Sequence, residues 1–250
     1  MMTENITYPR RVISRRFLKF LAKAALATLS DFRIEGQENL PESGPLLVIG
    51  NHFSFIDPVA VLRTLPYQIE FVGGAVFPHA PKIVQFIPQL WGYYPVFRGT
   101  GSRFALRAAE EILKQNGVLG IMPEGGSWAE VLRPARPGAA YLAAQSGVKV
   151  LPLGIYGLNS IFPIQFGKRP KAVVKIGKPV GPFTASGRGR ERRDQLDQIG
   201  TELMKAIAAQ LPDSYRGFLA DDPATRNAAL GTEDYPWESL VEGQVEGEVH

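Results

Sequence analysis

The sequence contains no cysteine and only three histidines, His52, His79 and His250. The absence of cysteine excludes disulfides, thiolate metal sites and cysteine nucleophiles, and it fits a reducing compartment. A mechanism that needs an imidazole base therefore has few candidates. Among them, His52 has a carboxylate close by in sequence, because Asp57 follows it by five residues.

Long apolar runs are also missing, since none reaches the roughly 18–20 residues that a membrane-spanning helix needs. The nearest approach, Phe17 to Leu29, is interrupted by Lys19 and Lys23 and lacks the features of a signal peptide. Across residues 10–29, apolar positions recur at helical spacing among six basic residues. This pattern predicts an amphipathic helix, which either lies in a membrane interface or packs on the domain with its arginines in solvent.

Acidic residues are unevenly distributed. Residues 213–250 hold nine acidic residues and two arginines, a net charge of −7, which leaves +11 on residues 1–212. A basic body suits an anionic partner, such as a phosphate-bearing substrate, a membrane surface or a nucleic acid. We expect no nucleic acid, because no recognition motif accompanies the charge. The acidic C-terminal segment is poor in apolar residues, and we expect it to be disordered or loosely docked.

Between residues 32 and 212, short apolar runs alternate with amphipathic stretches, which predicts one α/β domain with a mixed, largely parallel sheet covered by helices. The expected strands cover 32–35, 46–49, 69–72, 94–97, 118–122, 148–155 and 173–176. The expected helices cover 58–64, 103–114, 138–145 and 190–211, and the stretch 77–90 is turn-rich and partly helical. The chain thus divides into an N-terminal basic amphipathic helix (1–31), this domain (32–212) and the acidic segment (213–250).

Three polar segments follow expected strands, where the ligand sites of such sheets lie. The first is "NHFSFID", with His52 and Asp57. A carboxylate that accepts a hydrogen bond from one ring nitrogen fixes the imidazole tautomer, so that the other nitrogen can take a proton from a hydroxyl group. The two side chains can meet only if the chain turns between them, because five helical residues would separate them by about 140°. A polar turn in which Asp57 caps the next helix fits the same residues.

The second segment is "VFRGTGS", in which Arg98 and Gly99 follow a strand and precede a helix. An arginine and the free N–H groups of a helix start both suit a phosphate, although a glycine-rich turn with a surface arginine fits equally.

The third segment is "IMPEGGSW", with Glu124 and Gly125 after a strand, and with Arg133 and Arg136 behind it. Here a buried carboxylate could orient the loop or position a substrate hydroxyl group, and a solvated glutamate on a turn is the alternative.

Taken together, these segments resemble the glycerophospholipid acyltransferase family, which includes 1-acyl-sn-glycerol-3-phosphate acyltransferases. The family's H-x4-D motif is matched by "NHFSFID", its arginine motif by "VFRG", its F-P-E-G-T-R-S motif in part by "MPEGGSW", and its fourth motif by "VLPLGIYG". The motifs occur in the family order, and the resemblance extends from about Phe32 to Val180.

The resemblance implies that His52, held by Asp57, is the base that activates a lipid hydroxyl group. That group attacks the thioester of acyl-acyl-carrier protein or acyl-coenzyme A, and no cofactor or metal is needed. Arg98, Gly99, Glu124, Gly125 and Arg136 would form the acceptor phosphate site. It also implies a lysophospholipid acceptor, phosphatidate as the product, and a peripheral place on the cytoplasmic face of a membrane.

One departure from the family affects the acceptor. Gly126 and Ser127 stand where the family usually has Thr-Arg, so a phosphate-binding arginine is absent from that loop. Arg133 or Arg136 could replace it, or the acceptor is another lysophospholipid or a lipid without phosphate. Two rival functions remain: a metal-dependent hydrolase, which the histidine spacing disfavours, and a non-catalytic lipid-binding module, which the His52–Asp57 pair disfavours.

Overall fold

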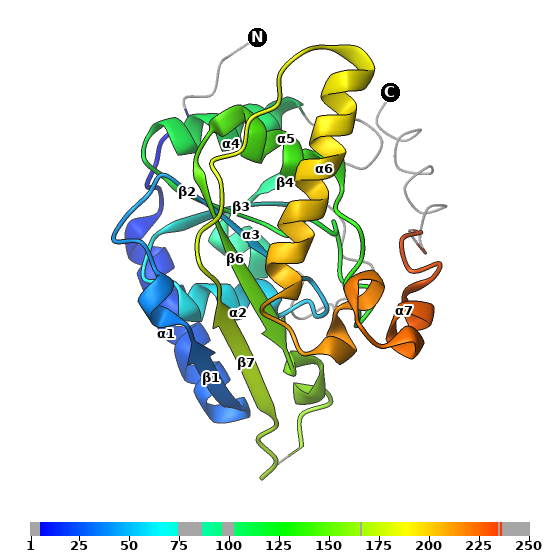
Figure 1. Cartoon of the computed structure of the whole chain (residues 1–250). Coiled ribbons are helices and arrows are strands. Elements are labelled where there is room, and N and C mark those ends of the chain that lie inside the picture. The colour runs from blue at the N-terminus through cyan, green and yellow to red at the C-terminus, as the bar shows by residue number, and fades with distance from the viewer. Residues whose placement is uncertain (1–5, 75–86, 97–102, 166, 235, 237–250) are drawn as a thin grey trace, which may run out of the picture.

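The structure is a computed structural model that describes residues 6–74, 87–96, 103–165, 167–234 and 236. Within these residues, seven strands form one sheet in the order β1-β7-β6-β2-β5-β3-β4 (Figure 1). The strands are β1 (Asp31–Glu35), β2 (Leu46–Gly50), β3 (Ile69–Gly74), β4 (Tyr94–Val96), β5 (Val118–Ile121), β6 (Lys149–Tyr156) and β7 (Lys171–Ile176). Each expected strand is present, with bounds that differ from the expectation by a few residues at most.

The sheet is mixed and largely parallel, as the sequence predicts. β6 and β7 pair antiparallel, and the other five neighbouring pairs are parallel. The five strands from β6 to β4 therefore end at the same edge of the sheet, and the segments that follow β2 and β5 come together there.

Helices cover both faces of the sheet, and alternate residues of its central strands point to opposite cores. On β2, Leu47 and Ile49 join the core beneath α4 (Arg103–Lys114), α5 (Pro137–Ser146) and α6 (Gly189–Ala208). Leu46 and Val48 join the core beneath α1 (Val12–Leu29), α2 (Asp57–Thr64) and α3 (Ile87–Trp91). Because β2 is buried on both faces, its sequence "LLVIG" is a continuous apolar run.

The N-terminal helix α1 packs on the domain through part of its basic side. Arg15 is fully buried and forms an ion pair with the equally buried Glu70 on β3. Arg10 adds a second ion pair to Glu70 at 2.9 Å. The amine of Lys19 donates to two backbone oxygens, those of Leu65 and Tyr67, at 2.6 and 2.9 Å. These three basic residues are thus partnered by the protein rather than solvated.

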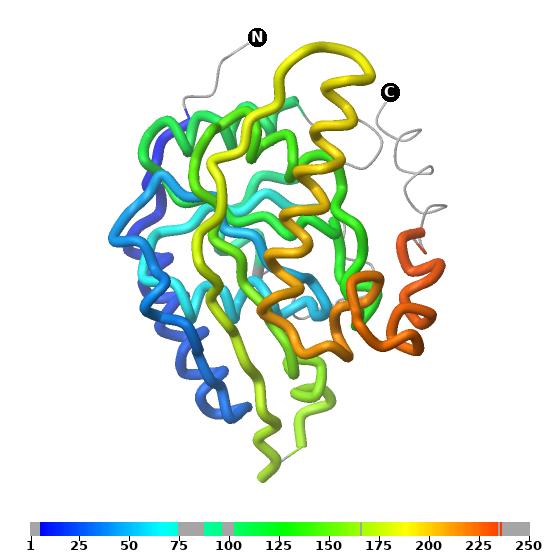
Figure 2. Tube along the Cα trace, in the orientation of Figure 1, coloured from blue at the N-terminus to red at the C-terminus, as the bar shows by residue number. Residues whose placement is uncertain are grey.

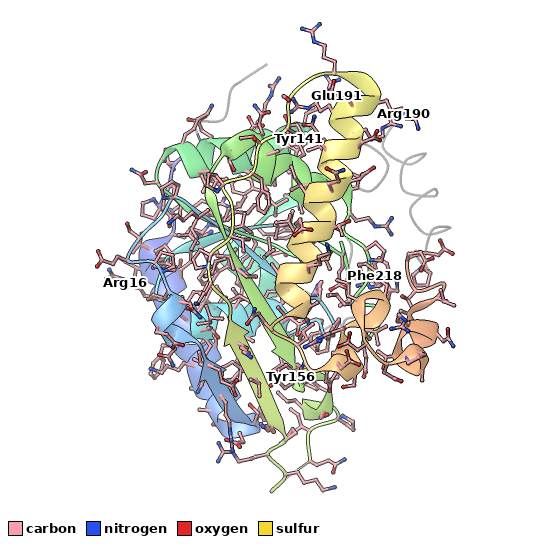
Figure 3. The ribbon with its side chains drawn as sticks, viewed as in Figure 1. Arg16, Tyr141, Tyr156, Arg190, Glu191 and Phe218 are labelled. Atoms are coloured by element: carbon pink, nitrogen blue, oxygen red, sulfur yellow. The ribbon has the colours of Figure 1, made fainter. Side chains whose placement is uncertain are left out.

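The opposite side of α1 carries apolar residues that face outward. Ile13, Phe17, Phe20 and Leu21 are 86%, 60%, 66% and 44% exposed and lie on one face of the helix. Arg16, which Figure 3 labels, is an exposed basic residue next to this face. We call these four apolar residues the outer stripe of α1. No helix in the described ranges is long and apolar enough to cross a membrane.

The acidic C-terminal segment is folded as far as Asp234, where its composition had predicted a disordered or loosely docked tail. It forms η4 (Asp213–Tyr215), η5 (Gly217–Leu219) and α7 (Pro223–Ala229), which lie beside the end of α6, in orange and red in Figure 2. Several of its carboxylates bond to its own backbone, since Asp213 accepts from the N–H groups of Asp221 and Asp222. Three of its apolar residues, Tyr215, Phe218 and Leu219, pack against the core. Residues 237–250 lie outside the described part of the chain.

Candidate active site

The chain leaves β2 in a turn that its neighbouring strand holds in place. The side chain of Asn51, fully buried, exchanges two hydrogen bonds with the backbone of Ile155 on β6, each 2.7 Å long. A buried amide that is satisfied in this way fixes the position of its own backbone. As a result, the next residue, His52, begins the turn at a defined point beyond the carboxyl end of the sheet.

His52 and Asp57 are brought together by this turn. The Nδ1 atom of His52 lies 3.1 Å from Oδ2 of Asp57, and the two side chains are 15% and 1% exposed. With Asp57 ionised, Nδ1 carries the ring proton and Nε2 is the nitrogen that can accept another. The pair therefore has the geometry of an oriented imidazole base.

Asp57 also organises the turn itself. Its Oδ2 accepts hydrogen bonds from the backbone N–H groups of Phe53 and Ser54, both 2.7 Å long. The expected forward cap on α2 is absent: the helix begins at Asp57, and the carboxylate reaches back into the turn instead. Burial raises the pKa of Asp57, and the hydrogen bonds from His52, Ser54 and Phe53 oppose that rise.

Glu124, in the loop after β5, holds the backbone of His52. It is 1% exposed, and its Oε1 accepts the His52 N–H at 2.6 Å. Its Oε2 accepts the backbone N–H and the Nε–H of Arg133, at 3.2 and 3.1 Å. Of the two roles expected for Glu124, this geometry matches orientation of the loop, because both oxygens already have protein donors.

Arg133 also holds the backbone of His52, through the carbonyl group of that residue. Its guanidinium group is buried, stacks 3.9 Å from the ring centre of Trp128, and donates to the backbone oxygens of Gly126 and, at 3.4 Å, His52. Burial raises the pKa of Glu124 to about 8, whereas the charge of Arg133 acts to lower it. The Glu124–Arg133 pair thus contacts both the N–H and the C=O of His52.

Of the other residues expected to bind the acceptor phosphate, Gly125 and Arg136 lie in the described part of the chain. Gly125 has a φ of +77°, and its N–H bonds to the oxygen of Met122, so the turn after β5 favours glycine at this position. Arg136 is exposed at the start of α5, and its N–H donates to the oxygen of Pro123 at 2.8 Å. Its guanidinium group donates to the oxygen of Glu233. Arg98 and Gly99 lie outside the described residues, as does His79.

Aromatic side chains from the C-terminal segment support the turn that carries His52. The ring of Tyr215 stacks on that of Phe53, with centres 5.9 Å apart, and packs against Tyr156 at 5.7 Å. Tyr156 ends β6 and is labelled in Figure 3. The sequence predicts neither these aromatic contacts nor the hydrogen bonds of Asn51. The sequence gives one indication that Asn51 is important, which is its position between a buried strand and His52.

A model of the Acyltransferase family matches residues 31–156, half of the chain. The match includes the turn with His52 and Asp57 as well as the loop with Glu124 and Gly125. It ends at Tyr156, so Arg133 and Arg136 are also within it.

Among curated proteins, a chloroplastic 1-acyl-sn-glycerol-3-phosphate acyltransferase of Brassica napus is 29% identical over 157 residues, which are 60% of this chain and 45% of that protein. The chain therefore spans less than half of that relative. The 1-acyl-sn-glycerol-3-phosphate acyltransferase of Bacillus subtilis is 25% identical over 166 residues, 65% of this chain and 81% of that enzyme.

Among solved structures, the 1-acyl-sn-glycerophosphate acyltransferase of Thermotoga maritima superimposes with a TM-score of 0.52 and 25% identity, covering 76% of this chain and 78% of that one. The fold, the order of the motifs and the family match agree. The chain belongs to the Acyltransferase family.

Proposed function

We propose that this protein is an O-acyltransferase that moves a fatty acyl group from a thioester to the free hydroxyl group of 1-acyl-glycerol-3-phosphate, giving phosphatidate. The observation that carries the proposal is the His52–Asp57 pair, at 3.1 Å, in a member of the Acyltransferase family. The names of its relatives supply the acceptor, since those from Brassica napus and Bacillus subtilis are both 1-acyl-sn-glycerol-3-phosphate acyltransferases.

In the proposed step, Nε2 of His52 takes the proton of the lipid hydroxyl group as its oxygen attacks the thioester carbonyl. The tetrahedral intermediate collapses, the carbon–sulfur bond breaks, and the leaving thiolate takes the proton from the imidazolium. Asp57 stabilises that imidazolium while it exists. The acyl group passes directly from sulfur to oxygen, so the step needs no acyl-enzyme and no cofactor. The donor is acyl-acyl-carrier protein or acyl-coenzyme A.

For the acceptor phosphate we propose Arg98 and Arg136, with the Glu124–Gly125 loop shaping the site. Arg136 is exposed and bonded through its N–H to the residue before Glu124. Arg133 is less suited to bind phosphate, because its guanidinium group is buried against Trp128 and paired with Glu124. Since Ser127 occupies the family's arginine position, another lysophospholipid, or a lipid without phosphate, is the alternative acceptor.

We further propose that the protein works at a membrane surface, on the cytoplasmic face, without spanning the bilayer. The outer stripe of α1 supports this, because four large apolar side chains face outward while Arg15 and Lys19 face the domain. Arg16 and Lys23, both exposed, flank the stripe. Such a helix suits the boundary between headgroups and acyl chains, where its apolar side is buried and its basic flank meets anionic lipids.

An acceptor screen with a radiolabelled acyl donor tests the proposed function. The purified protein would be given lysophosphatidate, other lysophospholipids and acceptors without phosphate, each with acyl-acyl-carrier protein and with acyl-coenzyme A. We expect labelled phosphatidate to be the main product. Transfer mainly to another lysolipid would support the alternative acceptor, and transfer to none of them would contradict the proposed function.

A further inference from the structure

Two large apolar side chains are exposed on the connection between β6 and β7. Phe162 is 36% exposed and Ile164 is 53% exposed, on the loop that follows η3 (Leu158–Ile161) and leads into β7. We call residues 162–165 and 167–170 the β6–β7 loop; residue 166, between them, lies outside the described part. Isolated exposed apolar residues are common on protein surfaces, so the surroundings of these two decide their meaning.

The β6–β7 loop adjoins the turn that carries the candidate base. The ring of Phe162 packs on that of Phe55, with centres 5.2 Å apart. Phe55 lies between His52 and Asp57 in the sequence. The exposed ring of Phe162 therefore lies at the edge of the candidate active site, and Ile164 follows it by two residues.

The same loop is bonded to the end of α1. The guanidinium group of Arg169 donates to the backbone oxygens of Ala27 and Ser30, at 2.6 and 2.9 Å. These carbonyl groups belong to the last turn of α1 and the residue that follows it, where a cation is favourable. Arg169 thus connects the loop beside the candidate base to the helix that carries the outer stripe.

The loop is basic, although one carboxylate lies beside it: Asp31, at the start of β1, donates its N–H to the oxygen of Pro170. Residues 131–190 contain ten lysines and arginines and no acidic residue. Of these, Lys168, Arg169 and Lys171 are exposed in or next to the loop. Basic residues close to a membrane surface are attracted to anionic lipids by about 1 kcal/mol each.

We propose that the β6–β7 loop is a second contact with an anionic lipid bilayer, in addition to α1, with Ile164 and Phe162 entering the interface and Lys168 meeting the headgroups. Together the two contacts hold the edge of the active site against the lipid surface. The inference rests on the proposed function, because an enzyme with a lipid acceptor needs its site at that surface. An acidic protein such as an acyl carrier protein would also meet the lysines. The exposed apolar residues, and the hydrogen bonds of Arg169 to the end of the helix that carries the outer stripe, favour the bilayer.

The test uses two variants of the full chain, Ile164→Ser and Lys168→Gln, each with a matched control. Leu230→Ser changes an apolar residue that is 75% exposed on the C-terminal segment, and Lys178→Gln changes an exposed lysine beyond the other end of β7. Thermal unfolding checks that each variant is folded. Binding is measured by co-sedimentation with phosphatidylcholine vesicles that contain or lack phosphatidylglycerol, without acyl donor.

We expect Ile164→Ser to weaken vesicle binding about tenfold, since a buried isoleucine side chain is lost from the interface. Lys168→Gln should weaken it about fivefold, and only when phosphatidylglycerol is present. Both controls should bind as the wild-type protein does. Equal effects of Ile164→Ser and Leu230→Ser, or normal vesicle binding by both loop variants, would overturn the proposal. So would loop variants that bind vesicles normally and lose only the binding of acyl carrier protein, measured by titration of the same samples.

Failure of this inference differs from failure of the proposed function. If the wild-type protein transfers no acyl group but the loop variants lose vesicle binding, the lipid contact stands and the proposed function fails. If acyl transfer occurs and the loop variants bind vesicles normally, the proposed function stands and the loop contact fails.

Discussion

The carboxylate of Asp57 has two tasks, neither of which is the helix cap that the sequence also allows. It lies 3.1 Å from the imidazole of His52, and it accepts the N–H groups of Phe53 and Ser54. A single side chain thus shapes the turn and orients the ring that the turn carries. Spacing alone could not decide this, because the path of the chain between residues 52 and 57 depends on these bonds.

The substitution Asp57→Asn should therefore separate the role of Asp57 in shaping the turn from the role of its negative charge. The amide side chain would be similar in size to the carboxylate, but it could not stabilise an imidazolium and would favour the wrong ring tautomer. We expect kcat for acyl transfer to fall on the order of 10³-fold or more, with little change in KM. The control is Asp31→Asn, which removes an exposed carboxylate that pairs with Arg33. A kcat close to that of the wild-type protein would contradict the role assigned to Asp57.

Arg133 is predicted to position His52 rather than to bind the acceptor. Arg133→Met would leave Glu124 buried without the cation that lowers its pKa, so the pKa of Glu124 would rise and the protonated carboxyl group would be favoured. We expect kcat to fall about 10²-fold through misplacement of His52, while KM for the acceptor stays unchanged. Arg133→Lys should restore part of kcat. A rise in KM with kcat retained would instead identify Arg133 as an acceptor ligand.

At the scale of secondary structure, the alternation of apolar runs and amphipathic stretches was sufficient to predict the strands and the main helices. The orientation of α1 was not predictable in the same way. The side of α1 that faces the domain is the one that pairs with Glu70. This residue lies 55 residues from Arg15 in the sequence and is fully buried beside it. Helical periodicity identifies two sides of a helix, but it does not say which one a distant carboxylate will bind.

The Arg15–Glu70 ion pair gives a stability prediction. Glu70→Gln would leave the buried Arg15 without a counter-charge, and we expect it to lower the free energy of unfolding by about 3–5 kcal/mol. Urea unfolding at neutral pH measures the loss. The matched control is Arg33→Ala, which breaks a pair whose side chains are 56% and 49% exposed and should cost less than about 1 kcal/mol. Similar losses of unfolding free energy in both variants would show that the buried pair contributes no more to stability than the exposed pair.

At the scale of the whole molecule, the C-terminal segment joins regions far apart in the sequence. Composition predicts a disordered or loosely docked tail because it averages over the segment, whereas a few residues determine its docking. Tyr215 stacks on Phe53, and the oxygen of Thr232 accepts the indole N–H of Trp128 at 2.7 Å. These contacts reach the turn with His52 and the loop with Glu124.

Gly217 lies close to the backbone of Leu132, with no room for a side chain. Its φ is +54°, and a Cβ atom there would lie 2.0 Å from the backbone oxygen of Leu132, next to Arg133. We expect Gly217→Ala to lower the free energy of unfolding by about 2–5 kcal/mol, from backbone strain and from the clash. Gly231→Ala is the control, since Gly231 has a φ of +77° and open space around it; it should cost only about 1–2 kcal/mol. Equal costs would show that the segment is not tightly docked at Leu132.

The proposed acyl transfer depends on one imidazole, that of His52. The most direct measurement compares wild-type protein and His52→Ala for transfer of a radiolabelled acyl group to 1-acyl-glycerol-3-phosphate, with circular dichroism and vesicle binding recorded on the same samples. General-base catalysis contributes about 10²–10⁴-fold, so we predict at least that loss of labelled phosphatidate, with fold and vesicle binding retained. Transfer by His52→Ala at the wild-type rate would contradict the account.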